Sequence, residues 1–113
     1  MSSDDYLIEW LGSRAVVRMP AEIDVTNADQ ARAALVAAAD QDPAALIIDM
    51  SATTFCDSAG VQAIVMGYRQ AAGNRTRLRL VTTEVGRILQ LAGIGELMPI
   101  DASLDAALAA TEG

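Results

Sequence analysis

The most chemically suggestive segment runs from Ile47 to Gly60, where an apolar run gives way to polar residues and an Asp-Ser-Ala-Gly sequence. Open α/β sheets place their sites at the carboxyl ends of such strands. Asp57 and Ser58 stand at the expected start of a helix, whose first amides lack partners and whose dipole is positive. A hydroxyl exposed there could accept a phosphoryl group, held by the free amides. On local sequence alone, a plain helix cap, with Gly60 relieving crowding in the first turn, is the simpler interpretation.

The rest of the composition offers little for catalysis. The chain has no histidine, which removes the usual general base, the histidine-containing triad and histidine metal ligands. Every basic residue is arginine, so no lysine can bind phosphate in a P-loop or form a Schiff base. We therefore expect a protein that is not an enzyme and that has neither a metal site nor a cofactor. The net charge of −7 argues against binding to nucleic acid or anionic lipid.

Length and composition fit one globular domain. We expect a single domain over residues 1–113, with an ordered core over about residues 5–111. Hydrophobic residues make up 52% of the chain and charged residues 20%, a balance that disfavours intrinsic disorder. No apolar run approaches a membrane span, and no N-terminal signal is recognisable. The one cysteine, Cys56, excludes an internal disulfide and fits a reducing compartment, so a cytoplasmic protein is expected.

Alternating short strands and helices are expected to position the polar segment. Residues 6–11 and 15–19 should pair as a hairpin around Gly12-Ser13, with Val16 on the solvent face and Pro20 ending the second strand. Further strands are expected at residues 44–48, a continuous apolar run typical of a strand covered on both faces, at 78–81 and, as a short apolar piece, at 97–100. Helices are expected at residues 26–39, 58–73, 84–92 and from about residue 103. In the third of these helices the residues expected to face inward are Val85, Ile88, Leu89 and Ala92. This order predicts the α/β class, with a mixed sheet of four to five strands and about four helices.

Several segments, in the right order, resemble the STAS domain, the fold shared by sulfate-transporter tails and anti-sigma factor antagonists. The main match is the Asp-Met-Ser and Phe-Cys-Asp-Ser-Ala-Gly pattern over residues 49–60. The Ala-Glu-Ile-Asp-Val stretch at residues 21–25 resembles the family's Gly-Glu-Leu-Asp segment, although alanine replaces its frequent glycine. Residues 82–94 resemble the family's third helix. The similarity covers nearly the whole chain and implies a STAS fold.

The resemblance also implies roles for individual residues. In stand-alone bacterial members, a partner kinase that doubles as an anti-sigma factor phosphorylates the serine after the motif's aspartate. That serine corresponds to Ser58, and the aspartate to Asp57. The family's acidic residue after the second strand corresponds to Asp24, which should lie close to the phosphorylation loop. Ala59 stands where the family often has a second serine or threonine, which leaves Ser58 as the acceptor.

The partner surface is expected on the helix that begins at Ser58. Its inward stripe should contain Val61, Ile64, Val65, Tyr68 and Ala72. Met66 lies off this stripe beside Gln62 and Arg69, and methionine adapts to varied partners, so this face is the candidate docking surface. Plain exposure of the face is the alternative. The expected switch and partner-binding residues are Asp24, Asp57, Ala59, Gly60, Gln62, Met66 and Arg69.

Other distinctive residues are expected to be structural. Cys56 has no base or cation beside it in the sequence and should pack as a small hydrophobe. Arg75, Arg77 and Arg79 should lie on a solvated strand face, since a nucleic-acid patch would need aromatic residues and a net positive charge. Trp10 should pack over the sheet.

As a whole, the resemblance implies an anti-sigma factor antagonist. The unphosphorylated protein would bind an anti-sigma factor serine kinase and so release a sigma factor for transcription. Phosphorylation of Ser58 with ATP and Mg²⁺ would break the complex, and a serine phosphatase would reset it. The alternative is a STAS scaffold or an accessory subunit of a transport system or signalling complex that is never phosphorylated. A two-component receiver is rejected, because Asp49 lacks the acidic pair and the lysine which that chemistry needs.

Overall fold

The computed structural model describes residues 7–112, so the part of the expected hairpin and ordered core before Leu7 lies outside the described residues. The strands are β1 (Leu7–Leu11), β2 (Arg14–Arg18), β3 (Glu22–Ile23), β4 (Ala45–Met50), β5 (Phe55–Cys56), β6 (Arg77–Thr82) and β7 (Ile100–Asp101). The helices are α1 (Ala28–Ala39), α2 (Ser58–Gly73), α3 (Gly86–Leu91), α4 (Ile94–Leu97) and α5 (Leu104–Ala110).

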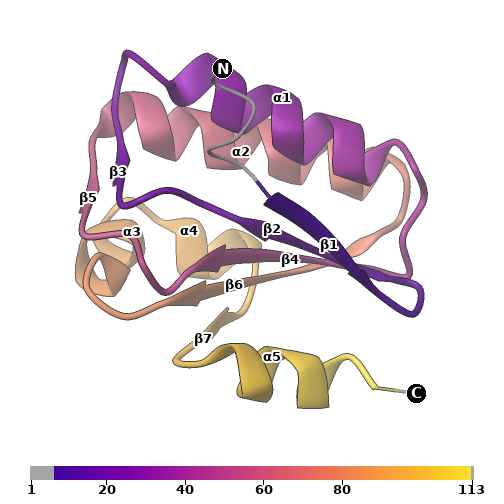
Figure 1. Cartoon of the computed structure of the whole chain (residues 1–113). Helices are drawn as coiled ribbons and strands as arrows, with labels where there is room; N and C mark the ends of the chain where they lie inside the picture. Colours follow the sequence, from indigo (N-terminus) through magenta and orange to yellow (C-terminus); the bar gives the residue numbers. More distant parts are fainter. Residues whose placement is uncertain (1–6, 113) are drawn as a thin grey trace.

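The main sheet has five strands in the order β1-β2-β4-β6-β7 (Figure 1). Strand β1 runs antiparallel to β2, whereas β2, β4, β6 and β7 are parallel to one another. The hairpin turns at Gly12, whose φ of 65° is a left-handed conformation that glycine adopts without strain. All six residues of β4 are buried, as expected for a central strand covered on both faces. The predicted α/β class and mixed sheet are therefore confirmed.

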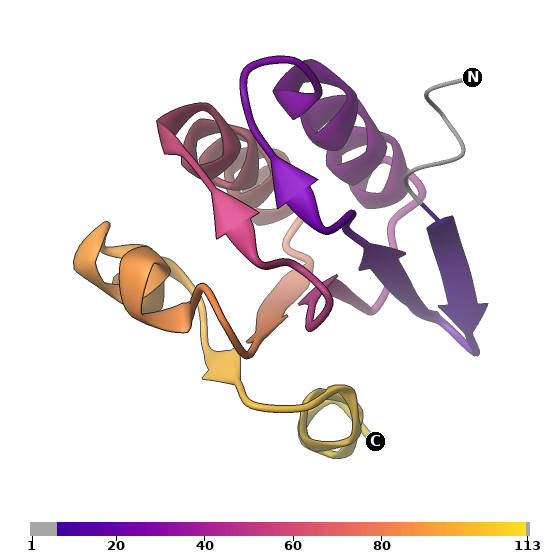
Figure 2. The ribbon, with the colours of Figure 1, turned by 60° about the vertical axis from the view of Figure 1, so that its left-hand side comes forward.

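A second, two-stranded parallel sheet joins β3 to β5, and the sequence analysis missed both strands. Figure 2 shows the two strands side by side, beyond the end of the main sheet. Each has only two residues, too few to show the alternating pattern by which strands are recognised. This small sheet brings the chain before α1 next to the chain before α2.

Helices cover both faces of the main sheet. Helices α1 and α2 lie side by side over one face, and α5 lies under the other (Figure 1). The expectation that Val16 faces solvent is wrong: it is buried with Ile47, Val81 and Ala107 in a core formed by the sheet and α5. Sequence periodicity separated the two faces of β2 correctly but did not show that α5 covers the second one.

The buried stripe of α2 is rotated from the expected one. Only Ile64 of the expected residues is fully buried, while Ala72 is exposed. The buried positions are Gly60, Ala63, Ile64, Gly67 and Ala71. Small residues face α1 because the two helices approach closely: a Cβ added to Gly67 would lie 2.8 Å from the Cβ of Leu35. Larger apolar side chains, such as Val65 and Tyr68, lie at the margins of this contact and are half-buried.

After β6, the structure has two short helices where one longer helix was expected. The predicted helix at residues 84–92 is the six-residue α3, and α4 follows it after Gly93, whose φ of 88° ends the first helix. Arg79 does not lie on a solvated face, because Asp101 of β7 binds it in a half-buried ion pair at 2.7 Å. Trp10, on the edge strand β1, is more exposed than expected.

Candidate functional site

Asp57 sets the start of α2 as its N-cap. Its backbone is extended (φ −94°, ψ −171°), and its carboxylate accepts a hydrogen bond from the amide of Gly60 at 3.1 Å. Its carbonyl oxygen accepts the amide of Val61 at 3.0 Å. The predicted cap is therefore confirmed, and it fixes the direction in which the first residue of the helix projects.

Ser58 is that first residue, and it is exposed. Among residues 7–112, its hydroxyl makes no hydrogen bond, and the backbone amides of Ser58 and Ala59 have no acceptor. Helix α2 has 16 residues, so its positive N-terminal end favours an anion on this side chain. The hydroxyl is thus accessible and unoccupied by internal contacts, which are the geometric requirements for a phosphoryl acceptor.

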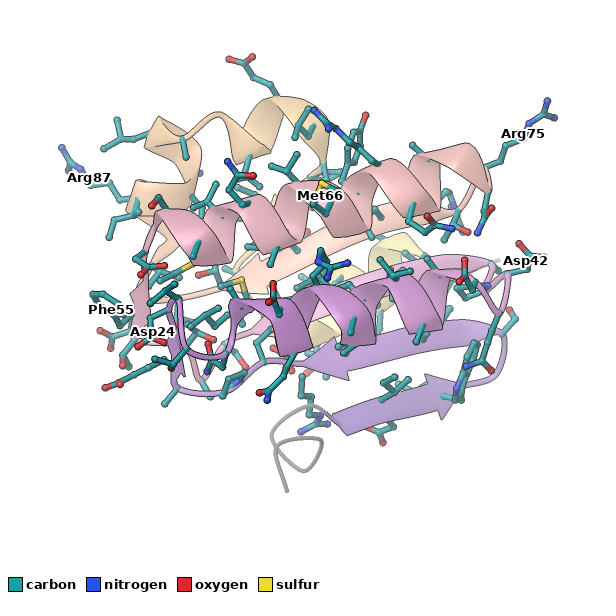
Figure 3. The ribbon with its side chains drawn as sticks, turned by 90° about the horizontal axis from the view of Figure 1, so that it is seen from above. Asp24, Asp42, Phe55, Met66, Arg75 and Arg87 are labelled. Atoms are coloured by element: carbon teal, nitrogen blue, oxygen red, sulfur yellow. The ribbon has the colours of Figure 1, made fainter. Side chains whose placement is uncertain are left out.

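The small β3–β5 sheet places Asp24 beside the start of α2. Ile23 pairs with Cys56, and the amide of Asp57 donates to the carbonyl oxygen of Ile23 at 3.1 Å. Asp24 follows Ile23 directly, so the expected closeness of Asp24 to this loop is confirmed. Figure 3 shows Asp24 and Phe55 at the same end of the molecule, near the start of α2. Asp57 directly precedes the candidate acceptor, and Asp24 lies on the segment that pairs with the chain just before it.

The Asp24 carboxylate has its own local partners. It accepts hydrogen bonds from the hydroxyl of Thr26 and, at 2.9 Å, from the backbone amide of Thr26. These bonds, the one from the hydroxyl first, lower the pKa of Asp24. Asp24 is therefore ionised at neutral pH and adds a fixed negative charge to this end of the molecule.

Cys56 and Gly60 form the packed base of the site. Cys56 is buried, and burial, assisted by the charge of Asp57, raises the pKa of its thiol to about 11. This confirms its structural role, since a protonated buried thiol is inert. A Cβ on Gly60 would lie 2.6 Å from the Cys56 sulfur and 3.0 Å from Cγ2 of Ile23. Gly60 is therefore buried and allows α2 to approach the β3–β5 sheet, so it positions the surface without forming part of it.

A groove of about 440 Å³ lies between α1 and α2. Its lining includes three of the predicted partner-binding residues, Ala59, Gln62 and Met66, together with Val25, Ala28, Asp29, Arg32 and Ala63. Met66 is exposed, as expected, and Figure 3 shows it on α2 in the view from above. Arg69 is exposed one turn further along α2 but does not line the groove.

A second groove, of about 470 Å³, lies between α2 and α3. It is lined by Cys56, Asp57, Ser58, Val61, Gln62, Ile88 and Ala92. The contribution of α3 was not predicted, because Ile88 and Ala92 were expected to face inward. Both are exposed, whereas Val85 and Leu89 are buried as expected. Because α3 has only six residues, the spacing between Ile88 and the buried Val85 and Leu89 fits either a buried or an exposed Ile88.

Two further properties bear on the kind of site this is. Within residues 7–112, no three His, Cys, Asp or Glu side chains gather where they could hold a metal ion. None of the helices in this part of the chain is long and apolar enough to cross a membrane.

A mixed sheet flanked by helices, with a polar segment leading from its central strand to Ser58 at the start of α2, defines an α/β domain. The model of the STAS domain matches residues 8–107, so the chain belongs to the STAS domain family. The resemblance seen in the sequence is thereby confirmed. No curated protein matched the sequence significantly.

Solved structures with the same fold include several anti-sigma factor antagonists. An anti-sigma factor antagonist from Mycobacterium paratuberculosis is 29% identical, with a TM-score of 0.86 over 94% of this chain and 92% of that one. The anti-sigma factor antagonist SpoIIAA in its unphosphorylated form is 22% identical, with a TM-score of 0.75 over 96% of this chain and 98% of that one. The murine anion transporter Slc26a9 is 19% identical, with a TM-score of 0.71 over 91% of this chain but 18% of that one. The last two likenesses concern the fold alone.

Proposed function

We propose that this protein is an anti-sigma factor antagonist controlled by phosphorylation of Ser58. In its unphosphorylated form it binds an anti-sigma factor serine kinase in the cytoplasm, and the kinase then releases its sigma factor. The protein is a substrate of that kinase and not itself an enzyme. A serine phosphatase returns it to the binding form.

The observation that carries this proposal is the exposed hydroxyl of Ser58 at the first position of α2. The groove-lining residues Ala59, Gln62 and Met66 follow it along the same helix, so the hydroxyl adjoins the predicted partner surface. The 29% identical structure of an anti-sigma factor antagonist supports the assignment of the general role. The acidic chain, with a net charge of −7, suits a partner with basic groups around a nucleotide pocket.

In the transfer step, the Ser58 oxygen attacks the γ-phosphorus of ATP bound with Mg²⁺ in the kinase. A bond forms between that oxygen and the γ-phosphorus, the bond from the γ-phosphorus to the β–γ bridging oxygen breaks, and ADP leaves with the bridging oxygen. The serine proton passes to a base of the kinase. Reset by the phosphatase consumes one water and releases inorganic phosphate and the free hydroxyl.

Phosphorylation changes the charge of the surface at a single point. The phosphoserine carries roughly −1.5 to −2 charges at neutral pH. The positive end of α2 and the amides of Ser58 and Ala59 favour this charge within the protein. Asp57 and Asp24 already make the surroundings negative, so a docked surface that tolerates the hydroxyl would meet a concentrated negative charge. We expect the affinity for the kinase to fall at least about tenfold, because burying an unpaired charge at an interface costs more than 1.4 kcal/mol.

The test uses purified anti-sigma factor kinases with ATP and Mg²⁺, followed by intact-mass analysis and peptide mapping. The wild-type chain should gain one phosphate at Ser58. The Ser58→Ala variant should gain none and should still bind the kinase in a titration without ATP. The matched control is Ser51→Ala, which removes another exposed serine of the loop between β4 and α2 and should leave phosphorylation unchanged. Ser58→Asp should bind more weakly than wild type, although one carboxylate carries less charge than a phosphate.

Three outcomes would contradict the proposal. Phosphate on Ser58→Ala would place the switch at another residue, and equal affinity of the phosphorylated and unphosphorylated chains would remove the switching step. Failure of every kinase to modify or bind the wild-type chain would favour the alternative, a STAS scaffold or accessory subunit of a transport system or signalling complex. The similarity in fold to a domain-sized part of the anion transporter Slc26a9 is the observation that favours this alternative.

A further inference from the structure

The start of α2 is a ridge between two grooves, and the candidate acceptor belongs to only one of them. Ser58 and Val61 line the groove toward α3, whereas Ala59 and Ala63 line the groove toward α1. Gln62 borders both. The hydroxyl that would receive the phosphate therefore borders the groove on the α3 side and not the groove on the α1 side.

The far wall of the α2–α3 groove is apolar and open. Ile88 of α3 is 51% exposed although it is a large aliphatic residue, and Ala92 at the end of the same helix is also exposed. Val61 contributes a half-buried aliphatic side chain from α2. The opposite rim is acidic, because Asp57 lines the groove next to Ser58.

We propose that the α2–α3 groove is the recognition groove for the kinase that phosphorylates Ser58, with Ile88 as its main contact on α3. This inference rests on the function proposed above. The occupant is a segment of the anti-sigma factor kinase beside its nucleotide pocket, with an apolar side chain that packs on Ile88 and Val61 and a basic side chain near Asp57. The groove itself argues for this partner, because Ser58 and Ile88 line the same groove, so a kinase segment seated in it would contact Ile88 beside the acceptor.

The α1–α2 groove is expected to contribute to the affinity for the kinase and not to phosphate transfer. Met66 and Ala63 lie along α2 beyond the phosphorylated turn and add contact area without touching the transferred phosphate. Changes there should alter the affinity for the kinase, whereas changes at Ile88 should alter both affinity and the rate of phosphate transfer, because they misplace the nucleotide relative to Ser58.

The experiment compares two like substitutions on one helix. Ile88→Ser removes an apolar side chain from the groove, and Leu91→Ser removes a more exposed one, at 80%, that does not line it. With an anti-sigma factor kinase that phosphorylates the wild-type chain, Ile88→Ser should lower kcat/KM for Ser58 by about tenfold or more, as expected for a central apolar contact. Leu91→Ser should stay within about twofold of wild type, as peripheral contacts do. Ala92→Gln, which fills the groove without removing a contact, should lower the rate as Ile88→Ser does.

Circular dichroism and thermal melts establish that each variant is folded. Equal phosphorylation of wild type, Ile88→Ser and Ala92→Gln would overturn the inference and leave the proposed function intact. Equal losses of kcat/KM in Ile88→Ser and Leu91→Ser would also overturn the inference, because a residue that lines the groove would then matter no more than one outside it. A wild-type dimer that Ile88→Ser converts to a monomer, with unchanged phosphorylation, would assign the groove to a second copy of this chain instead. A wild-type chain that takes no phosphate contradicts the proposed function first, and the inference with it.

Discussion

Asp24 carries its charge beside the candidate phosphorylation site because its neighbour Thr26 stabilises the carboxylate. The sequence pointed to Asp24 only through its family resemblance, since nothing in local spacing shows that the segments around residues 24 and 57 are neighbours. Their proximity arises from the β3–β5 pairing, which two-residue strands do not reveal in advance. By contrast, the cap at Asp57 was predictable, because a cap depends on residues within one helical turn.

The hydrogen bonds from Thr26 to Asp24 predict how the stability of the protein changes at acid pH. In Thr26→Val the hydroxyl bond is lost, so the pKa of Asp24 should rise toward its ordinary value. A carboxyl whose pKa is lowered on folding stabilises the protein at neutral pH, and that contribution disappears as the pH falls through the lowered pKa. The variant should therefore lose less stability than wild type on acidification. An NMR titration of the Asp24 carboxyl carbon, with urea unfolding at neutral and acid pH, measures both effects.

The control for this change is Thr54→Val, which removes a hydroxyl bonded to the carbonyl of Ala21 in the same region. It should leave the titration of Asp24 unchanged. If Thr26→Val does not move the Asp24 titration either, the hydroxyl bond does not stabilise the carboxylate.

At the scale of the elements, the contact between α1 and α2 decides which residues the helices bury. The amphipathic pattern of α2 located the helix and its end at Gly73, but it selected the larger apolar residues as the inward stripe. The spacing of apolar residues depends only on their hydrophobicity and carries no information on how closely two helices pack. Close approach requires small residues, and Ala63, Gly67 and Ala71 supply them.

Two glycines of α2 test this account directly. Gly67→Ala would put a methyl group 2.8 Å from Cβ of Leu35 and 2.9 Å from its Cδ1. Alanine favours a helix over glycine by about 1 kcal/mol, but the overpacked contact should cost about 1–3 kcal/mol and make the variant less stable. Gly73→Ala meets no atom within 4 Å and should be neutral or stabilising. Urea denaturation of both variants gives the comparison, and a stabilised Gly67→Ala would show that the two helices have room to separate.

On the scale of the whole molecule, the sheet is held between two layers of unequal size. The larger core lies between the sheet and helices α1 and α2, and the smaller one consists of Val16, Ile47 and Val81 of the sheet with Ala107 of α5. The uninterrupted apolar run of β4 predicted a strand covered on both faces, and the last helix was predicted from about Ser103, its N-cap. What could not be read from the sequence was the docking of that helix, because its contacts join residues roughly 90 positions apart.

Arg14 is the shorter of two polar links between the sheet and the end of α5; in the other, Arg77 of β6 donates to the carbonyl oxygen of Thr111 at 3.4 Å. The Arg14 guanidinium donates to the carbonyl oxygen of Leu108 at 2.9 Å and lies 3.4 Å from the hydroxyl of Thr111, at the negative end of the helix dipole. Arg14→Ala should therefore lower the free energy of unfolding by about 1–3 kcal/mol, as for other hydrogen bonds from charged groups, and should speed amide exchange over residues 104–110.

Arg18 of the same strand is the matched control, because it pairs with Glu9 at the surface, where both side chains are 48% exposed. Arg18→Ala should change stability by less than about 1 kcal/mol, since exposed ion pairs contribute little. Urea unfolding and hydrogen exchange of both variants distinguish the two arginines. If Arg14→Ala exchanges no faster than Arg18→Ala over α5, the hydrogen bonds of Arg14 do not hold that helix. The proposed partner surface on α2 should be unaffected by the loss of the Arg14 bonds, because α5 and α2 lie on opposite faces of the sheet (Figure 1).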